Sequence, residues 1–294
     1  RKLADLIRSV PEDTVLTFEL IENQLEISAL KFQADFSTLP VGDFPVTEIQ
    51  EFEREVALPG KELSDLIEKT SFAMASQDVR YYLNGILLEV SPSQINVVAT
   101  DGHRLAWSSC KIKTDFTDEK IIIPRKSALE LQKLLNLYPE NVNIAFNSNQ
   151  LKVFSDEYTF ISKLIEGSYP DYEKVFPKGT EQKLKANKSL VQTALNRAAV
   201  LSNEKYRGVK FILEKDNLKI CANNPSKESA EEEVLVEYSG DSFEIGFNIS
   251  YVQESLSVIS NNEVEFVFFG SENSCLVKNI DDESLIHVIM PMRL

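Results

Sequence analysis

An internal repeat constrains the fold of this chain more than any other feature of its sequence. The tripeptide Asn-Gln-Leu stands at residues 23–25 and again at 149–151, and each copy follows a helical pattern that ends in Pro-Glu. The apolar residues of the preceding helix correspond as well: Leu3, Leu6 and Ile7 in one copy, and Leu131, Leu134 and Leu135 in the other. The repeat is about 125 residues long, the size of a domain with its own core.

A third copy keeps the same order near the end of the chain. It has a helix around residues 251–258, strands at 264–269 and 275–278, and a closing Met290-Pro291 in the place of Phe44-Pro45 and Tyr169-Pro170. The front halves repeat too, since residues 73–76 and 86–87 return as 199–202 and 212–213. Each full unit therefore reads helix, strands, helix, strands.

The position of the helices within the repeat predicts where the domains begin and end. The second unit has a long segment before its second helix at Lys126, whereas the first unit begins at that second helix. We therefore expect the first domain to be incomplete here. The predicted domains are residues 1–54 (the C-terminal half of the first), 55–175 and 176–294.

Each unit has the pattern of an α+β domain. Segments such as 94–100 and 151–155 are short, rich in β-branched and aromatic residues and bounded by Asn, Asp or Gly, as in antiparallel hairpins. The helical segments carry apolar residues at positions i, i+3 and i+4, for example Leu63, Leu66 and Ile67. Helices packed on antiparallel sheets are expected. A tandem array without special geometry remains an alternative.

Composition limits the classes of protein and compartment. The net charge of −15 would on average repel nucleic acid. No apolar run is long enough to span a membrane, and the first residues lack the apolar core of a signal peptide. The chain starts at Arg1 as if cut. Cys110, Cys221 and Cys275 form no CxxC pair. A cytoplasmic protein without a structural metal is expected.

Five separated strings resemble a known family. They are residues 77–85 (QDVRYYLNG), 99–106 (ATDGHRLA), 201–209 (LSNEKYRGV), 245–251 (IGFNISY) and 290–294 (MPMRL). In this order they resemble the β subunit of bacterial DNA polymerase III, the β sliding clamp family.

The resemblance implies an architecture and a function. It implies three repeated clamp domains, with helices lining the inner face of a ring and antiparallel sheets outside, and a head-to-tail homodimer. Such a ring is a processivity factor that encircles duplex DNA without reading its sequence. It would tether DNA polymerase subunits, the clamp loader and repair proteins by linear peptide motifs, and it would need no cofactor.

The acidic total charge is compatible with a ring that contacts DNA only on its inner surface. Polar, aromatic and cationic side chains on or beside the helices suit contact with the DNA backbone. The candidates are Arg1, Lys2, Gln77, Arg80, Tyr81, Tyr82, Arg125, Lys126, Lys133, Arg197 and Lys205. The alternative for each cation is a solvated surface charge. Arg125 and Lys126 stand out because a cation at a helix start opposes the helix dipole.

The resemblance also places a peptide pocket where the second and third domains meet. Its residues are Leu83, Thr100, Gly102, His103, Arg104, Leu105, Pro170, Lys174, Val175, Asn248, Tyr251, Val288, Met290, Pro291, Met292 and Arg293. Methionines suit a site that accepts several peptides, although they could equally fill a core. Lys174 stands where the family often has arginine, and it keeps the charge without the planar fork.

A dimer interface follows from the same resemblance. The segment 31–36 alternates as a strand and resembles the interface edge of the first domain, with Phe32, Ala34 and Phe36. Val200 and Leu201 resemble the facing surface of the third domain. An ordinary internal strand is the alternative, and Ala34 stands where many members have an aromatic residue.

Two other classes of function are less consistent with the sequence. An enzyme would need more than the cluster Asp101, His103 and Arg104, because the chain has only two histidines and no GxSxG, P-loop or HExxH motif. A metal-dependent nuclease would need convergent carboxylates, whereas Glu231, Glu232 and Glu233 look like a solvated face. A scaffold of repeated domains that binds no DNA is the other alternative.

Overall fold

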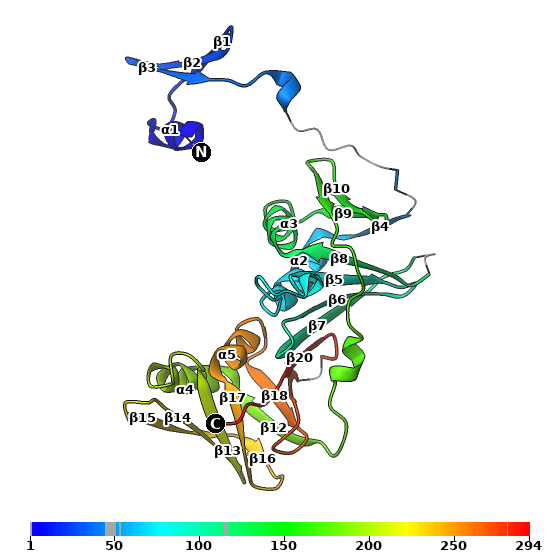
Figure 1. The fold of residues 1–294 in the computed structure, drawn as a ribbon, viewed down its shortest axis with the longest axis vertical. Coiled ribbons are helices and arrows are strands. Elements are labelled where there is room, and N and C mark those ends of the chain that lie inside the picture. Colours follow the sequence, from blue (N-terminus) through cyan, green and yellow to red (C-terminus); the bar gives the residue numbers. More distant parts are fainter. Residues whose placement is uncertain (1, 45–50, 53, 115–116, 281) are drawn as a thin grey trace. The chain divides into compact units, whose positions relative to one another are not determined.

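The computed structural model describes residues 2–44, 51–52, 54–114, 117–280 and 282–294 (Figure 1). The chain divides into two compact units, Arg1–Gln50 and Glu51–Leu294. Each unit is described by itself.

The first unit is a helix followed by three antiparallel strands. Its elements are α1 (Lys2–Ser9), β1 (Thr17–Ile21), β2 (Gln24–Ala29), β3 (Phe32–Ser37) and the short 3-10 helix η1 (Val41–Asp43). The strands follow one another in the sheet, so β1 and β3 are both edges. Ile27 and Ala29 are buried, but α1 buries no residue within residues 2–44, and Leu3 and Ile7 are exposed.

The second unit holds two domains in succession. The first of them comprises β4 (Arg54–Pro59), α2 (Gly60–Ser71), η2 (Tyr81–Leu83), β5 (Gly85–Val90), β6 (Gln94–Thr100), β7 (Arg104–Lys111), β8 (Glu119–Pro124), α3 (Arg125–Leu137), β9 (Asn141–Phe146), β10 (Gln150–Phe154) and β11 (Thr159–Lys163). The 3-10 helix η3 (Tyr172–Val175) follows in the connection to the next domain.

The last domain repeats this order. It comprises β12 (Gln182–Asn187), α4 (Lys188–Val200), β13 (Gly208–Glu214), β14 (Asn217–Asn223), β15 (Ser229–Leu235), β16 (Glu237–Tyr238), β17 (Phe243–Asn248), α5 (Ile249–Ser257), β18 (Glu263–Phe268), β19 (Cys275–Asn279) and β20 (Leu285–Ile289). In both domains a strand and a helix precede one set of strands, and a second helix precedes the last three. Within residues 2–44 the first unit has the counterparts of that second helix and its three strands, followed by η1.

The predicted α+β repeat is therefore confirmed, with one difference in alignment. Met290 follows β20 directly, whereas Tyr169 stands well beyond the end of β11. The structural counterpart of Met292 is instead Ile165. The Met292 N–H donates to the Gly246 carbonyl of β17 at 2.8 Å, and the Ile165 N–H donates to the Ile122 carbonyl of β8 at 2.9 Å. The Met-Pro and Tyr-Pro pairs match in sequence but not in position.

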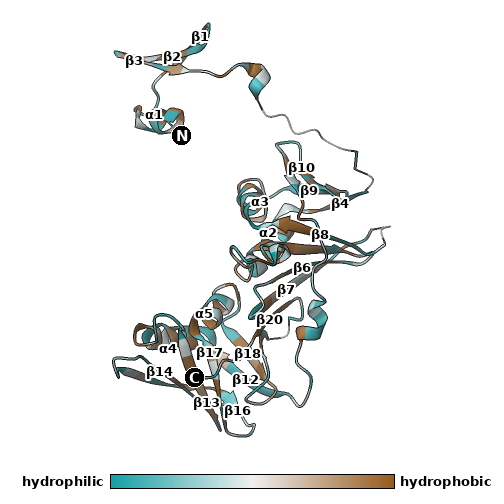
Figure 2. Cartoon of the chain, in the orientation of Figure 1, coloured by the Kyte–Doolittle hydropathy of each residue, from teal (hydrophilic) through white to brown (hydrophobic). Residues whose placement is uncertain are grey.

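Helices and sheets divide each domain into two layers. Within Glu51–Leu294 the four helices lie along one side of the sheets (Figure 1). The apolar stripe predicted for α2 is buried, with Leu63 at 1% and Ile67 at 0% exposure. Strand β8 is largely hydrophobic in Figure 2 and buries Ile121 and Ile123 in the same core. Asn187 and Asn248 cap α4 and α5 by accepting hydrogen bonds from backbone N–H groups.

A single sheet continues from one domain into the next. Its nine strands run β16-β12-β18-β19-β20-β7-β6-β5-β8, and the pair β20·β7 joins the two domains. This antiparallel ladder places Val288 opposite Leu105 and His287 opposite Ala106. Backbone hydrogen bonds therefore fix the junction between the second and third domains.

His287 is a buried polar group of this junction. Its side chain has no exposed surface, its Nε2 lies 3.1 Å from the Lys69 carbonyl oxygen, and the Phe72 ring meets it edge-on at 5.1 Å. Lys69 and Phe72 belong to α2 and its C-terminal end, whereas His287 belongs to β20. Burial lowers the pKa of His287 to about 4, so the ring is neutral at pH 7.

Replacing His287 by Leu should flatten the dependence of stability on pH. The unfolded chain protonates this histidine near its ordinary pKa of 6.5, whereas the folded chain does so only near 4. Its contribution is therefore complete above pH 6.5 and is lost as the pH falls toward 4, by about 3 kcal/mol at most. Urea unfolding of both proteins at neutral and acidic pH measures the difference. Parallel losses in parent and variant would contradict this account.

Candidate functional site

The turn between β6 and β7 is the rigid centre of the candidate pocket. The Thr100 hydroxyl donates to the Arg104 carbonyl at 2.5 Å and accepts from the Gly102 N–H at 3.1 Å. The Asp101 carboxylate accepts from the N–H groups of His103 and Arg104. Gly102 has a φ of +88°, which a side chain would strain. Thr100 and Gly102, both predicted pocket residues, therefore determine the shape of this turn.

The last residues of the chain run from this turn onto the third domain. The Met290 N–H donates to the His103 carbonyl of the second domain at 3.0 Å, and the Met292 N–H donates to the Gly246 carbonyl of the third. Glycine is required beneath this tail, because a Cβ at Gly246 would lie 2.5 Å from the Met292 carbonyl oxygen. Pro291 and Met292 are half-buried, while Arg293 is exposed. The predicted tail thus spans the junction of the two domains.

An apolar cluster lies on the outer face of the joined sheet, opposite the helices. Its buried members are Leu87, Val98, Leu105, Ile122, Tyr172 and Val288, and Val175 packs against them. Tyr172 is held by a hydrogen bond from its hydroxyl to the Glu89 carboxylate at 2.5 Å. Three of the predicted pocket residues, Leu105, Val175 and Val288, therefore meet here.

Other predicted pocket residues surround this cluster with different roles. Leu83 is buried in η2, where its N–H bonds the Arg80 carbonyl and its carbonyl accepts from Ala75. Pro170 and Lys174 are exposed, and the Lys174 ammonium pairs with the Asp171 carboxylate at 2.8 Å. The side-chain oxygen of Asn248 caps α5 by accepting a hydrogen bond from the Ser250 N–H at 2.9 Å.

Arg104 faces the helix side of the junction. Its guanidinium lies over the Tyr251 ring, with 4.4 Å between the Cζ atom and the ring centroid. It pairs with Asp101 of its own turn and with Glu254 of α5. Sequence reasoning placed Arg104 and Tyr251 in the pocket but missed Glu254, which stands 150 positions away from Arg104 along the chain. No local pattern signals such a pair.

The loop before η2 and the first residues of η2 bring together four of the candidate DNA contacts, Gln77, Arg80, Tyr81 and Tyr82. Gln77 is exposed and has a φ of +58°, Tyr81 is 58% exposed, and its ring meets Tyr82 edge-on at 5.9 Å. The Arg80 guanidinium forms a two-point contact with Asp78, which lowers the pKa of that carboxyl to about 2. The charge of Arg80 is thus largely neutralised within the loop.

The remaining candidate cations differ in whether their charged groups bond to other groups of the protein. Arg125 donates to the Met74 carbonyl at 3.0 Å, which gives this helix-start cation a structural role. Lys133 pairs with Glu130, and Arg197 pairs with Glu232 of β15. In the described chain Lys126 and Lys205 are exposed and make no ion pair, although Lys205 lies 5.2 Å from the Tyr206 ring. Lys2 is exposed on α1, and Arg1 lies outside the described residues.

Charge is distributed unevenly over the helices. Helix α3 carries three cations and one carboxylate, and α4 carries two cations and no carboxylate. The acidic run predicted as a solvated face lies on β15, at an edge of its sheet, where Glu231 and Glu233 pair with Lys219. A net charge of −15 therefore does not describe the surface of α3 and α4.

The candidate interface residues lie on or beside open sheet edges. Phe32, Ala34 and Phe36 belong to the edge strand β3, with Ala34 and Phe36 half-buried. Val200 ends α4 and is 78% exposed, and Leu201 follows it as the C-cap residue. Strand β15, on which α4 packs, is also an edge.

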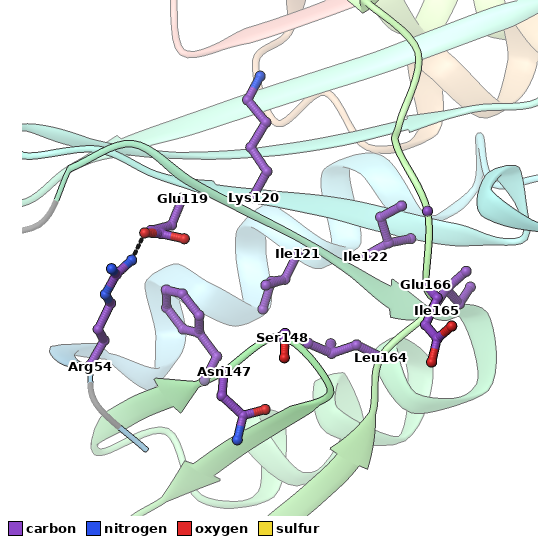
Figure 3. Close-up of a pocket in the computed structure, with 12 residues that line it drawn as sticks. Arg54, Glu119, Lys120, Ile121, Ile122, Asn147, Ser148, Leu164, Ile165 and Glu166 are labelled. Carbon is purple, nitrogen blue, oxygen red and sulfur yellow. Dashed lines mark ion pairs between the residues drawn. The ribbon is translucent and has the colours of Figure 1, made fainter. Parts of the chain in front are cut away.

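Two equivalent hollows lie in the second and third domains, and of these two only the hollow in the third domain is lined by predicted pocket residues, Pro291, Met292 and Arg293. One, of 510 Å³, is bounded by the Arg54–Glu119 ion pair, Ile121 of β8 and Leu164 (Figure 3). The other, of 480 Å³, lies at β17 in the third domain and is bounded by the last residues of the chain. They occupy the same place in the repeat, beside the equivalent bonds of Ile165 and Met292. The sequence repeat could have indicated this correspondence, but not the hollows.

Two further observations bear on chemistry and location. Among the described residues no group of three or more histidines, cysteines or acidic residues is arranged to hold a metal ion. None of the helices in the described ranges has the length and apolar character needed to cross a membrane.

Comparison with known proteins identifies the family. Residues 57–171 match the family model of the DNA polymerase III beta subunit, central domain, and residues 173–293 match that of its C-terminal domain. The beta sliding clamp of Pseudomonas aeruginosa is 43% identical over 295 residues, which cover 100% of this chain and 80% of that protein. The chain belongs to the beta subunit family of DNA polymerase III. Its function is that of a sliding-clamp processivity factor.

Solved structures of the Pseudomonas aeruginosa sliding clamp agree with this assignment. A crystal structure with ligand matches with a TM-score of 0.95 and 43% identity, covering 100% of this chain and 81% of the other. A second, bound to griselimycin, matches with a TM-score of 0.93 at 43% identity and covers 100% and 80% of the two chains. The resemblance inferred from the five strings is therefore confirmed, and so is the predicted clamp fold.

The roles of single residues and the predicted domain boundaries remain predictions. The structure brings Thr100, Gly102, His103 and Arg104 together in one turn, and joins that turn to Met290. It separates the outer apolar cluster from the Arg104 guanidinium, which points toward α5. The predicted pocket residues therefore lie on two surfaces, the outer apolar cluster and the side facing α5, which the turn between β6 and β7 connects.

Proposed function

We propose that the junction of the second and third domains docks partner proteins by a linear peptide segment. The observation that carries this proposal is the course of the last residues, which bond to the His103 carbonyl and then to the Gly246 carbonyl beside an apolar cluster. Apolar side chains next to backbone bonding groups suit an extended peptide. The griselimycin complex of the related Pseudomonas aeruginosa clamp supports a ligand site in this family. No catalytic step is part of the proposal.

Deleting residues 290–294 should abolish binding of a fluorescent griselimycin derivative while the chain stays folded. The deletion removes the tail but leaves the β7·β20 ladder, which ends at Ile289. Gly246→Ala should weaken binding by about tenfold or more, because its Cβ would displace the Met292 carbonyl. Fluorescence polarisation measures both.

Gly42→Ala is the matched control, because a Cβ at Gly42 meets nothing within 4 Å. It should bind like the parent. Undiminished affinity in the deletion variant would contradict this placement of the pocket.

We further propose that duplex DNA passes along α3 and α4, with the loop 76–82 beside it. Lys126 and Lys205 have ammonium groups free of carboxylates in the described chain, and Tyr81 and Gln77 are exposed. Phosphate contacts of this kind carry no sequence information. A small number of free cations suits a surface that must slide, since each firm phosphate contact slows movement.

Lys126→Ala should weaken binding of short duplex DNA and reduce the slope of log affinity against log salt by about one. Lys215→Ala is the control, because Lys215 is also an exposed lysine and lies in the turn between β13 and β14. A fluorescence titration at several salt concentrations measures both slopes. Equal slopes for Lys126→Ala and the parent would remove Lys126 from the interface.

The repeat also supports a homodimer through strand pairing. Strand β3 is the last strand of its unit, as β20 is of the third domain, and β15 holds the place in the third domain that β7 holds in the second. Since β20 pairs with β7, we propose that β3 pairs with β15 of a second copy. Such pairing would bring Phe32, Ala34 and Phe36 to the interface, near Val200 and Leu201 of the second copy.

Phe36→Asp should shift the chain toward the monomer in sedimentation velocity at micromolar concentration, because it places a charge at the paired edge. Val15→Asp serves as the control, since Val15 is 83% exposed ahead of β1. A parent chain that sediments only as a monomer would contradict the pairing.

A further inference from the structure

We propose that Glu254 positions the peptide pocket through Arg104. Glu254 does not touch the ligand. It holds α5 of the third domain against the turn of the second domain whose His103 carbonyl binds the tail. This inference rests on the proposed docking function and assigns a role within that site to a residue outside the predicted pocket.

The Arg104 guanidinium bonds three protein groups and lies against two aromatic rings. Its Nε donates to the Asp101 carboxylate at 3.1 Å and its Nη2 to the Phe72 carbonyl at 2.7 Å, while its Nη1 bonds the Glu254 carboxylate. The rings of Phe72 and Tyr251 lie 5.2 and 4.4 Å from its Cζ atom. Three of the five N–H donors of the guanidinium are therefore bonded within the protein, and two aromatic rings lie against it.

Glu254 supplies the ionic link between the two domains at this point. Asp101 and Phe72 belong to the second domain, as Arg104 does, so their bonds fix the side chain within its own domain. Glu254 and Tyr251 lie on α5, in the third. The side chain of Arg104 is 9% exposed and that of Glu254 is 47% exposed. Withdrawing the carboxylate would leave a nearly buried cation with one fewer partner.

The same turn connects this pair to the tail. Asp101 binds the Arg104 side chain with one oxygen and the N–H groups of His103 and Arg104 with the other. The His103 carbonyl in turn accepts the Met290 N–H. A shift of Arg104 relative to α5 would therefore move the His103 carbonyl and disturb its hydrogen bond with the Met290 N–H.

The fold does not depend on this pair. The β7·β20 ladder joins the domains by backbone bonds, and His287 packs against Phe72 beside it. Loss of the Glu254 carboxylate should therefore loosen the helix side of the junction without separating the domains. A carboxylate of comparable exposure is that of Glu181, whose side chain is 50% exposed and pairs with the exposed Lys183 at 3.2 Å.

The experiment compares the full chain with Glu254→Gln and with Glu181→Gln as the control. Binding is measured with fluorescent griselimycin, and amide hydrogen exchange is measured by NMR at Met290 and Met292. The Met290 N–H bridges the two domains, whereas the Met292 N–H bonds within the third domain.

Glu254→Gln should weaken griselimycin binding by about five- to tenfold and speed exchange at Met290 by a similar factor, with Met292 unchanged. Glu254→Asp, which keeps the charge, should restore part of the affinity. Glu181→Gln should behave as the parent. A general loss of structure would instead speed exchange at both amides.

Three results would overturn the inference while the parent binds griselimycin. The first is unchanged binding and exchange in Glu254→Gln. The second is tighter binding, which would mean that the released guanidinium contacts the ligand directly. The third is equal acceleration at Met290 and Met292. A parent that fails to bind griselimycin would contradict the docking function itself, and the exchange ratio at Met290 would still report on the link between Glu254 and the tail.

Discussion

The antiparallel pairing of β7 with β20 is the interaction on which the rest of the second unit depends. It turns two domains with separate cores into one continuous nine-stranded sheet. Backbone hydrogen bonds fix the register, so Val288 must stand opposite Leu105 and Ile289 opposite Arg104. That register places apolar side chains on the outer face and sets the Arg104 side chain, as well as the buried His287, toward the helices.

Polar groups on the helix side of this ladder add specificity to a junction that apolar contacts alone would leave less defined. A buried imidazole and a buried guanidinium both carry a desolvation cost that only well-placed partners offset. Lys69 supplies a carbonyl to His287, and Phe72 supplies one to Arg104. The end of α2 thus provides acceptors for both groups. A different angle between the domains would separate His287 from the Lys69 carbonyl and Arg104 from the Glu254 carboxylate, and both buried side chains would then lose a partner.

How much of this could be predicted from the sequence depended on the range of the interaction. The repeat predicted the order of elements because helical stripes such as Leu63 and Ile67, and short alternating strands, are local patterns. The match of Met290-Pro291 to Tyr169-Pro170 was wrong in position, because residue identity does not report where a strand ends. The family strings included residues 100–104, which form the turn between β6 and β7 in the structure. The ion pair of Arg104 with Glu254 could not be predicted from the sequence, because contacts between distant segments leave no periodic signal.

The electrostatics of the chain show why a total charge is a poor guide to a surface that slides. Four of the candidate cations already bond to groups of the protein itself: Arg80 to Asp78, Arg125 to the Met74 carbonyl, Lys133 to Glu130 and Arg197 to Glu232. Ion pairs of this kind at exposed sites stabilise little, but they lower the charge available to phosphates. With α3 and α4 still net cationic and β15 acidic, the proposed path of DNA follows the cationic helices and not the acidic strand. Weak, sequence-independent attraction is what a mobile tether requires, because the topology of a closed ring, rather than affinity, would then keep the protein on DNA.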